Sequence, residues 1–355
     1  MRTTSLACIA LLNLVMGCGS PPPPEPPPAP ALLEPAAPAA PAAPTASPTA
    51  SAASAPAASA SAAAAPPADD KFANVNIKME KVAGTVYILE GAGGNIGVSV
   101  GDDGIVIVDD QFAPLAPKIK EALKGITDRP VRVVLNTHWH RDHTGGNAVF
   151  GSGAAIIAHE NVRKRLASGG PKVVLGSDTL DATPPAPREA LPVVTFQDKV
   201  SVHLNGEEIR AIHFPSGHTD GDVIVHFTKS NVVHMGDDFV TYGFPFVDLT
   251  SGGSVRGLIA AIDKAARELP PDVKVIPGHG KVSSIEDLKK LSAALKGCVK
   301  LVEAEVKKKK TLAQIQQAKV LANYDDMGKG FMKTDTFIEI VFKELTNQQN
   351  VFVPH

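Results

Sequence analysis

Residues 18–70 of this 355-residue chain consist almost only of Pro, Ala, Ser, Thr and Glu, as in "PPPPEPPPAP". Such a segment has almost no large apolar side chains to bury, so folding cannot offset the loss of chain entropy. Its many prolines favour an extended and partly stiff chain. We therefore expect residues 18–70 to form a disordered tether, which leaves about 285 residues for a folded domain.

The residues before the tether read "MRTTSLACIALLNLVMGCGS". One Arg, a short apolar run and then small residues are typical of a secretory signal peptide, here residues 1–17. The segment "LVMGC" also resembles a bacterial lipobox, in which Cys18 would carry the lipid. We expect an exported protein, periplasmic or elsewhere in the cell envelope, that is anchored to the outer membrane by a lipid on Cys18. An ordinary cleaved signal is the alternative.

Cysteine content and net charge bear on internal disulfides and on nucleic-acid binding. Beyond Cys8 and Cys18 only Cys298 remains, so the domain has no internal disulfide, and we expect Cys298 to be buried apolar filler. The formal net charge of -2 gives no argument for a nucleic-acid partner.

Beyond the tether, runs rich in Val and Ile are separated by glycine turns, which is typical of strands. Helical spacing of apolar residues predicts helices at 113–126, 254–269, 283–310 and 335–347. Ser254 is placed to cap the second of these, and Ser283 with Glu286 forms a predicted capping box for the third.

The order strand-rich, mixed, strand-rich and helical occurs twice along the chain. This order fits an α+β fold of the αββα sandwich type, with two stacked mixed β-sheets and helices on the outer faces. We expect residues 71–282 to form the core of the domain and residues 283–355 a helical extension that completes it.

The segment "NTHWHRDHTGGN", residues 136–147, places three histidines and one aspartate within six positions. His138 and His140 are two residues apart, so in an extended backbone they point the same way and can share one metal ion. Asp142 and His143 follow after a turn, point elsewhere and suit a second ion. The alternative is a polar surface loop that happens to be rich in histidine.

Further polar residues with metal-ligand chemistry stand where a strand ends or a loop begins. A loop at a strand end is where a rigid scaffold presents reactive groups. These residues are His218 in "SGHTDGD", Asp237 in "HMGDDF", His279 in "PGHG", and Asp109 and Asp110 in "VDD".

His-x-His-x-Asp-His, followed by Gly-His, Gly-Asp and Gly-His, resembles the metallo-β-lactamase superfamily, and the motifs stand in family order between roughly residues 80 and 282. The resemblance implies the metallo-β-lactamase fold and two Zn²⁺ ions per chain. It implies that the first zinc is held by His138, His140 and His218, that the second is held by Asp142, His143 and His279, and that Asp237 bridges the pair.

The same resemblance implies a hydrolytic reaction. A hydroxide between the two ions would attack a carbonyl carbon, and the metals would take up the oxyanion charge. Asp142 would act as the catalytic residue, because besides binding metal it can orient the nucleophile. Asp109 resembles the family's supporting carboxylate behind the metal ligands, or is simply the aspartate that ends a strand.

Two aromatic residues are candidates for substrate binding. Tyr242 could donate a hydrogen bond to the oxyanion or leaving group, or could pack in the core. Trp139 could line the cleft, or could pack under the loop. The segment Phe239–Phe246 is rich in aromatic residues and is expected to shape an apolar pocket. The remaining strand histidines are expected to be packed or surface residues: His159, His203, His213, His226 and His234.

Asp237 stands where zinc β-lactamases of this fold typically carry Cys or Ser, and no lysine follows it in "DFVTYGFPFVD". These departures favour a zinc-dependent hydrolase that cleaves a small ester, lactone, thioester or amide, with a small molecule as substrate and no nucleic acid. The alternatives are a β-lactamase, a noncatalytic metal-binding envelope lipoprotein and an iron oxygenase. The sequence leaves the oligomeric state open.

Overall fold

The computed structural model describes residues 70–176 and 178–346, all of which lie in one compact unit that spans residues 63–355. The predicted signal peptide (residues 1–17), Cys18 and all but the last residue of the predicted tether lie outside the described residues. Within the described ranges, no helix combines the length and apolarity needed to cross a bilayer.

Two β-sheets form the centre of the unit. The first has seven strands in the order β1-β2-β3-β4-β5-β6-β9, antiparallel up to β4 and parallel from β4 onward. Its strands are β1 (Lys78–Ala83), β2 (Val86–Glu90), β3 (Ile96–Gly101), β4 (Gly104–Val108), β5 (Val131–Leu135), β6 (Ala155–His159) and β9 (Val194–Phe196).

The second sheet has five strands in the order β10-β11-β12-β13-β14, and only β13 and β14 run parallel. Its strands are β10 (Lys199–Leu204), β11 (Glu207–His213), β12 (Val223–Phe227), β13 (Val232–His234) and β14 (Lys274–Ile276). A separate hairpin consists of β7 (Val173–Leu175) and β8 (Asp178–Leu180).

The two sheets stack because their strands are apolar on both faces. In β4, Val106 and Val108 belong to the hydrophobic cluster shared with the second sheet, whereas Ile105 and Ile107 belong to the cluster on the outer face. Side chains alternate between the faces of a strand, so a continuous apolar run such as "GIVIV" predicts a strand covered on both sides.

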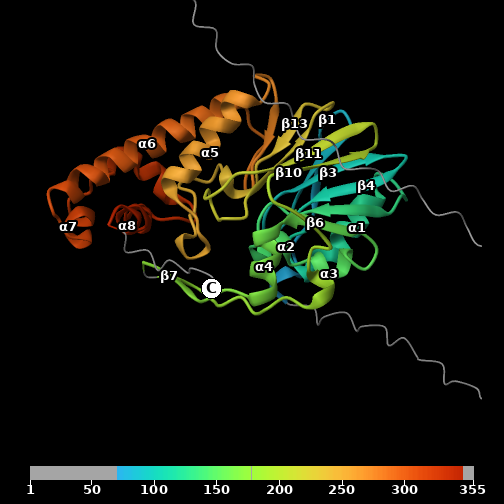
Figure 1. The fold of residues 1–355 in the computed structure, drawn as a ribbon, viewed down its shortest axis with the longest axis horizontal. Coiled ribbons are helices and arrows are strands. Elements are labelled where there is room, and N and C mark those ends of the chain that lie inside the picture. Colours follow the sequence, from blue (N-terminus) through green and yellow to red (C-terminus); the bar gives the residue numbers. More distant parts are fainter. Residues whose placement is uncertain (1–69, 177, 347–355) are drawn as a thin grey trace, which may run out of the picture. The chain divides into compact units, whose positions relative to one another are not determined.

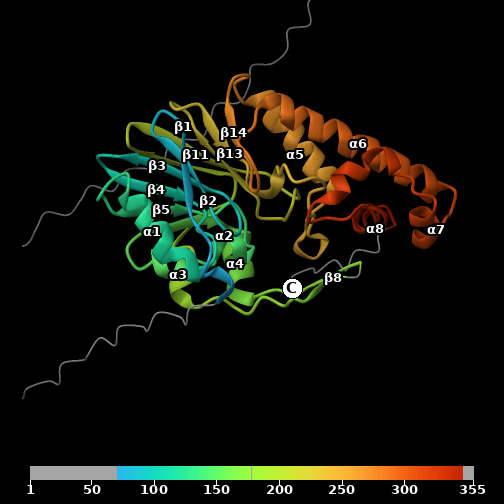
Figure 2. The same cartoon turned by 180° about the vertical axis from the view of Figure 1, so that it is seen from behind.

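Helices provide that cover (Figure 1). They are α1 (Ala116–Lys124), α2 (Arg141–Thr144), α3 (Asn147–Phe150), α4 (Glu160–Ser168), α5 (Val255–Glu268), α6 (Ile285–Lys307), α7 (Leu312–Gln317) and α8 (Thr334–Leu345). Figure 2, seen from behind, shows α1 beside the seven-stranded sheet and α5 to α8 gathered at the opposite end. The predicted αββα arrangement is confirmed.

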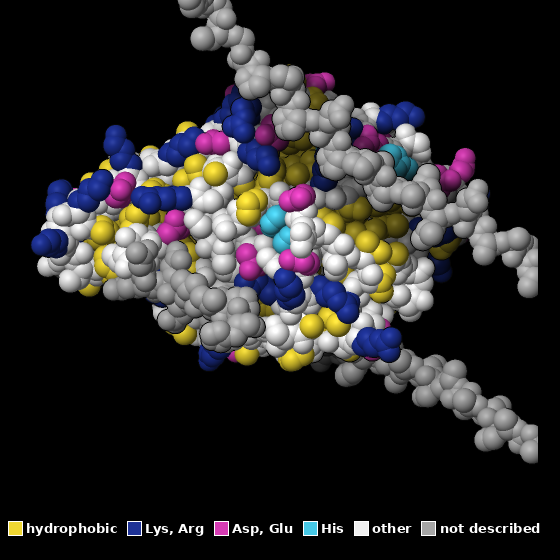
Figure 3. Space-filling model, in the orientation of Figure 1, with side chains coloured by type: hydrophobic (Ala, Val, Ile, Leu, Met, Phe, Trp, Pro, Cys, Tyr) yellow, Lys and Arg dark blue, Asp and Glu magenta, His cyan; other side chains and the backbone are white. Residues whose placement is uncertain are grey.

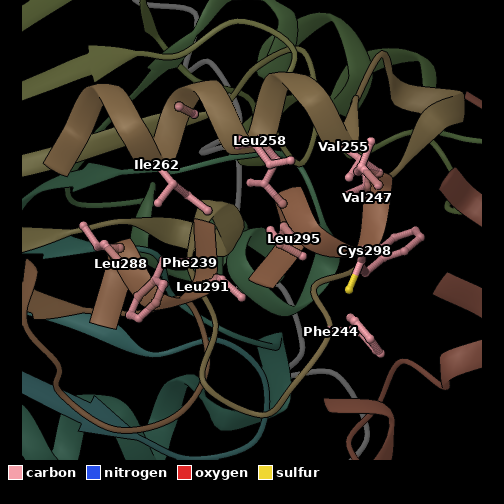
Figure 4. Close-up of a cluster of buried hydrophobic side chains, with 14 of the residues drawn as sticks. Phe239, Phe244, Val247, Val255, Leu258, Ile262, Leu288, Leu291, Leu295 and Cys298 are labelled. Carbon is pink, nitrogen blue, oxygen red and sulfur yellow. The ribbon is translucent and has the colours of Figure 1, made fainter. Parts of the chain in front are cut away.

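Helices α5, α6 and α8 pack on the outer face of the second sheet in the largest hydrophobic cluster. Figure 4 shows the part of this cluster formed by α5 and α6. Cys298 is fully buried there on α6, as expected. The Glu344 carboxylate of α8 accepts hydrogen bonds from Ser254 Oγ and from the backbone N–H groups of Val255 and Arg256 at the start of α5. The C-terminal helix therefore caps α5 as well as covering it.

The predicted capping box at Ser283 and Glu286 is wrong by one residue. The helix begins after Ser284, whose side chain pairs with Asp287 in a capping box. Ser283 exchanges two backbone hydrogen bonds with Val275, so its backbone is extended and cannot start the helix.

The sheet topology brings five loops to one edge. Strands β4 and β5 are parallel, so the loops that follow them leave from the same side, as do the loops after β13 and β14. Strand β12 is antiparallel to β13, so the loop that enters β12 lies at the end where β13 finishes. The loop after β4 carries Asp109, and the other four loops carry the predicted metal ligands.

Candidate metal centre

The three histidines predicted for one ion lie together. His138 and His140 follow β5, and His218 precedes β12. Nδ1 of His140 lies 2.8 Å from Nε2 of His218, and the His138 and His218 rings are 4.7 Å apart at their centroids. The potential ligand atoms of all three residues lie within 4.8 Å of one another. We refer to these three residues as the histidine half of the centre.

The residues predicted for the other ion also converge. Nε2 of His279 lies 3.2 Å from Oδ2 of Asp142 and 3.3 Å from Nε2 of His143. We refer to Asp142, His143 and His279 as the carboxylate half of the centre. Potential ligand atoms of these three residues also lie within 4.8 Å of one another.

Asp237 lies between the two halves. Its Oδ1 is 3.3 Å from Nε2 of His143, and its Oδ2 is 3.5 Å from Nε2 of His279 and 3.8 Å from Nε2 of His218. One carboxylate thus faces imidazoles of both halves, which is the position expected of a bridging ligand.

The donor set suits metal ions. Nε2 of His138 is buried and has no hydrogen-bond partner, although a buried polar atom normally has one. It belongs to a cluster in which imidazole nitrogens face other imidazole nitrogens and carboxylates. Imidazole and carboxylate ligands bind zinc, and also iron, so the residues present fit a metal pair.

Carboxylates and carbonyls orient the histidines from behind. Oδ2 of Asp109 lies 2.7 Å from Nδ1 of His143, and Asp109 also accepts hydrogen bonds from the backbone N–H and the hydroxyl of Thr137. Nδ1 of His218 lies 2.7 Å from the carbonyl oxygen of Phe246. Such partners select the tautomer of a metal-binding histidine and its ring orientation.

Asp248 was not predicted to belong to the site. Its Oδ2 lies 3.1 Å from Nε2 of His140, while its Oδ1 accepts hydrogen bonds from Thr250 and Ser251. Asp248 therefore supports His140 as Asp109 supports His143. The only signal in the sequence is an aspartate in "DLTS", which also reads as an ordinary turn cap.

The electrostatics differ within the centre. Burial would raise the pKa of Asp142, but the neighbouring His143 and His279 lower it to about 2. Burial would lower the pKa of His279, but Asp237 and Asp142 raise it to about 9. Burial and the neighbouring His140 lower the pKa of His218 to about 4. The carboxylate half therefore favours charged pairs, whereas burial lowers the pKa of His138 and His218 in the histidine half, which favours neutral imidazoles that can donate lone pairs.

Two glycines leave room for the ligands. A Cβ atom on Gly94 would lie 2.1 Å from Cε1 of His143, and one on Gly278 would lie 2.0 Å from Oδ1 of Asp237. Any larger residue at either position would displace the ligand, so we attribute both glycines to close approach of the backbone.

The two candidate substrate residues occupy different environments. Trp139 is buried, packs with Val162 and Leu166, and lies against Gly170, so it is under the loop rather than along a cleft. Tyr242 is partly exposed, with its ring centroid 5.8 Å from that of His279. Burial, together with the charges of Asp237 and Asp142, raises the pKa of the Tyr242 hydroxyl, which therefore stays protonated and able to donate.

The expected apolar pocket over Phe239–Phe246 is only partly present. Phe239 and Phe244 are buried in the cluster around α5 and α6 (Figure 4). The pocket that Phe239 lines is shared with α6 residues such as Lys290 and Leu291 and contains none of the predicted metal ligands. Phe246 reaches the site, and its ring lies 5.8 Å from that of His140 at an interplanar angle of 25°. Phe244 is held in the core by the C-terminal part of the chain, where it forms a β-bridge with Met332 and stacks on Phe337, and the segment itself does not reveal these contacts.

The centre opens to solvent on one side. Figure 3 shows histidine side chains at the surface near the middle of this face, with acidic side chains beside them. Among the cluster residues, the side chains of His140 and His279 are 18% and 24% exposed, and that of Asp142 is 30% exposed. His138 and His143 are buried. A small molecule can therefore approach the carboxylate half and His140.

Comparison with known proteins identifies relatives over part of the chain. A hydroxyacylglutathione hydrolase from Polaromonas sp. (strain JS666) is 30% identical over 154 residues, which cover 42% of this chain and 49% of that protein. The alpha subunit of 2,4-dinitroanisole O-demethylase from Nocardioides sp. is 28% identical over 46% of each chain. The chain thus spans about half the length of these curated relatives.

Solved structures share the fold at low identity. A metallo-beta-lactamase from Pontibacter korlensis matches with a TM-score of 0.51 and 20% identity, over 62% of this chain and 99% of that chain. A double mutant of the sec-alkyl sulfatase PisA1 matches with a TM-score of 0.57 and 14% identity, over 75% of this chain and 50% of that chain.

The model of the metallo-beta-lactamase superfamily matches residues 86–279, which is more than half of the chain and contains every predicted metal ligand. The resemblance read from the His-x-His-x-Asp-His motif is thereby confirmed. The chain belongs to the metallo-beta-lactamase superfamily, and its clustered histidines and aspartates could hold metal ions.

Proposed function

We propose that the protein is a dizinc hydrolase that cleaves a small ester, lactone, thioester or amide. The observation that carries this proposal is the position of Asp237, whose two oxygens face imidazoles of both halves of the centre. A single carboxylate between two converging ligand sets is suited to a pair of ions rather than to one.

In this proposal His138, His140 and His218 hold one zinc, Asp142, His143 and His279 hold the other, and Asp237 touches both. When bound, the metal pair would supply a water of lowered pKa as the nucleophile, together with Lewis acidity toward the substrate carbonyl.

The protein's own groups prepare the site for such a reaction. Asp142 is charged and partly exposed, so its second oxygen can accept a hydrogen bond from the incoming nucleophile and orient it. Tyr242 keeps a protonated hydroxyl and its ring lies against that of His279, so we assign to it donation to the oxyanion or to the leaving group. Asp109 orients His143 in the carboxylate half, and Asp248 orients His140 in the histidine half.

A thioester substrate has the strongest support among the four bond types. Two relatives, from Polaromonas sp. and Erythrobacter litoralis, are named hydroxyacylglutathione hydrolase, and an acylglutathione is a thioester. Asp237 and the absence of a lysine in "DFVTYGFPFVD" argue against a dedicated β-lactamase, although several structures with the same fold carry that name.

We also propose that the domain is exported and held at the outer membrane by a lipid on Cys18. The apolar run and the "LVMGC" segment support this proposal. Metabolic labelling with a palmitate analogue tests it, because labelling of the wild type and not of Cys18→Ser is expected. Equal labelling of both, or of neither, would contradict the anchor.

The hydrolase proposal is tested by metal analysis of the purified chain, paired with turnover of a thioester, a lactone, a phosphodiester, nitrocefin and a carbapenem. Two zinc ions per chain and turnover that Asp142→Ala abolishes are expected. One iron per chain, or turnover of nitrocefin and the carbapenem alone, would overturn the proposal. Asp263→Ala, a surface aspartate paired with Lys296 on α6, is the matched control.

A further inference from the structure

An exposed aromatic side chain stands beside the metal centre on the C-terminal extension. Phe331 lies between the 3-10 helix η6 (Ala322–Lys329) and α8, and it is 55% exposed. The next residue, Met332, is almost fully buried and forms a β-bridge with Phe244. Burial of one neighbour and exposure of the other means that the chain turns the Phe331 ring outward.

The backbone that carries Phe331 is held in place from both sides. The backbone N–H of Phe244 donates to the carbonyl oxygen of Met327, at 2.9 Å. A Cβ atom on Gly330 would lie 2.1 Å from the carbonyl oxygen of Tyr242, so the two segments are in close contact. The exposed ring is therefore presented by a fixed loop and is not the tip of a loose one.

Phe331 continues a row of rings that starts at the metal centre. Its ring centroid is 6.3 Å from that of Tyr242, with an interplanar angle of 80°. The Tyr242 ring is in turn 5.8 Å from that of His279, which belongs to the carboxylate half. Edge-to-face contacts of this kind are favourable, so Tyr242 and Phe331 form one continuous apolar edge beside His279.

A second aromatic ring borders the opposite half. Phe246 lies against both His140 and His218, with centroid distances of 5.8 and 5.6 Å. The polar centre is thus flanked by apolar rings at both halves, and only the row through Tyr242 extends outward into solvent. An apolar pocket wall beside a few convergent polar groups is typical of small-molecule sites.

We propose that Phe331 and Tyr242 form an apolar rim that contacts a hydrocarbon chain next to the scissile bond, so the substrate is a thioester or ester with a long apolar chain. This inference rests on the hydrolase function proposed above and narrows its substrate class. Phe331 acts in it as a specificity-determining residue, because it lies one ring away from the metal-binding imidazole and does not itself reach the centre.

The hydrocarbon chain of the substrate could belong to the acyl part or to the leaving group, and two substrate series separate these cases. One series has acetyl, hexanoyl and decanoyl thioesters of N-acetylcysteamine, and the other has S-ethyl, S-hexyl and S-decyl thioacetates. We expect kcat/KM to rise about tenfold from the shortest to the longest member of one series. Phe331→Ala is expected to remove most of that rise and to leave the shortest substrate within about twofold of the wild type.

Matched variants separate the rim from general damage. Phe331→Leu should keep most of the chain-length dependence, because leucine is also apolar. Leu301→Ala, which alters a partly exposed apolar residue on α6, should keep all of it. The thermal midpoint of Phe331→Ala should match that of the wild type, since the ring is mostly in water.

A binding measurement keeps the test independent of turnover. Calorimetric titration of the zinc-loaded chain with acetate, hexanoate and decanoate should show tighter binding of the longer anions, and Phe331→Ala should reduce this gain. Turnover that is independent of chain length in both series would overturn the rim while leaving the hydrolase proposal intact. If no ester, lactone, thioester or amide is cleaved, the hydrolase proposal fails, and equal binding of acetate and decanoate would then overturn the rim separately.

Discussion

Two groups of histidines on this fold have opposite environments. In the metal centre, the outer nitrogens of His143 and His140 lie against Asp109 and Asp248, and the inner nitrogens converge on each other. His159 and His213 lie elsewhere, with parallel rings 3.7 Å apart at an interplanar angle of 10°. Of the residues that the structure describes, the sets able to hold a metal do not include this stacked pair.

In the stacked pair, a ring nitrogen of each histidine makes a hydrogen bond to the backbone. Nδ1 of His213 lies 2.8 Å from the carbonyl oxygen of Asp222, and Nδ1 of His159 accepts from the backbone N–H of Asn161. Burial and the neighbouring His213 lower the pKa of His159 to about 4, whereas Asp237 and Asp142 raise that of His279 to about 9 despite its burial. Carboxylates among the histidines, more than histidines as such, distinguish the metal centre.

Metal removal should have the largest effect. Treatment with a chelator is expected to reduce hydrolysis below detection, because the proposed nucleophile and the oxyanion stabilisation both come from the bound metals. Turnover of the best thioester before and after dialysis, with zinc added back, measures this loss. The variant His159→Asn should respond in the same way as the wild type. Turnover that survives chelation would remove the functional distinction between the two groups of histidines.

Removing a supporting carboxylate should weaken metal binding. Asp109→Ala and Asp248→Ala are each expected to lower zinc affinity by about 10- to 100-fold, because each leaves one histidine free to change its orientation and tautomer. Competition with a chromophoric chelator measures the affinity of each half. Asp109→Ala should affect the carboxylate half and Asp248→Ala the histidine half. A loss of zinc affinity of the same size in the surface variant Asp263→Ala would contradict a specific role of the supporting carboxylates.

Acid should destabilise the protein through the stacked pair. His159 has a pKa of about 4 in the folded state against 6.5 normally, so the unfolded chain takes up a proton first as the pH falls. The free energy of unfolding should therefore be unaffected above about pH 6.5 and should fall between pH 6.5 and 4, by about 2 kcal/mol. Nearby Glu160 and Asp220 oppose the shift without reversing it.

The pH effect is measured as a difference between variants, because the metal centre also responds to acid. The free energy of unfolding of wild type minus that of His159→Asn, from denaturant titrations at pH 7.5 and about pH 4.5, isolates His159. A difference that stays constant with pH would show that folding does not lower the pKa of His159.

Replacing the second ring should have the smallest effect. His213→Phe keeps a ring against His159 and loses the hydrogen bond to the carbonyl oxygen of Asp222, so it should cost about 1 kcal/mol of stability. Its zinc content should equal that of the wild type, as measured by elemental analysis. A loss of zinc in this variant would mean that the stacked pair supports the metal centre.

The sequence predicted most of the centre and less of what surrounds it. Ligands such as His138 and His218 follow a motif with fixed order, and strands such as β4 are continuous apolar runs. Asp248 was missed because its partner His140 lies 108 residues away in the sequence and no local pattern links them. Trp139 could not be placed, because its neighbours Val162 and Gly170 come from a separate part of the chain.

Short, exposed elements also escaped prediction. Strand β1 has four exposed residues in succession and β10 alternates between exposed and partly buried residues, so neither shows the strong apolar pattern of β4. The hairpin β7–β8 contacts α8, where Gly176 lies close to Thr336. Such elements depend on tertiary contacts that a single sequence does not reveal.

The hydrogen bonds from the start of α5 to Glu344 have a consequence for the order of folding. All predicted metal ligands have been synthesised once residue 279 has been added. The start of α5, which Ser254 caps locally, gains its hydrogen bonds to Glu344 only with α8, and the largest hydrophobic cluster gains its last members with the same helix. Contacts between residues almost 90 positions apart form slowly, because a long loop must close first. The domain should therefore mature late, after synthesis of the last helix, and a nascent chain that ends before α8 should remain a client for chaperones.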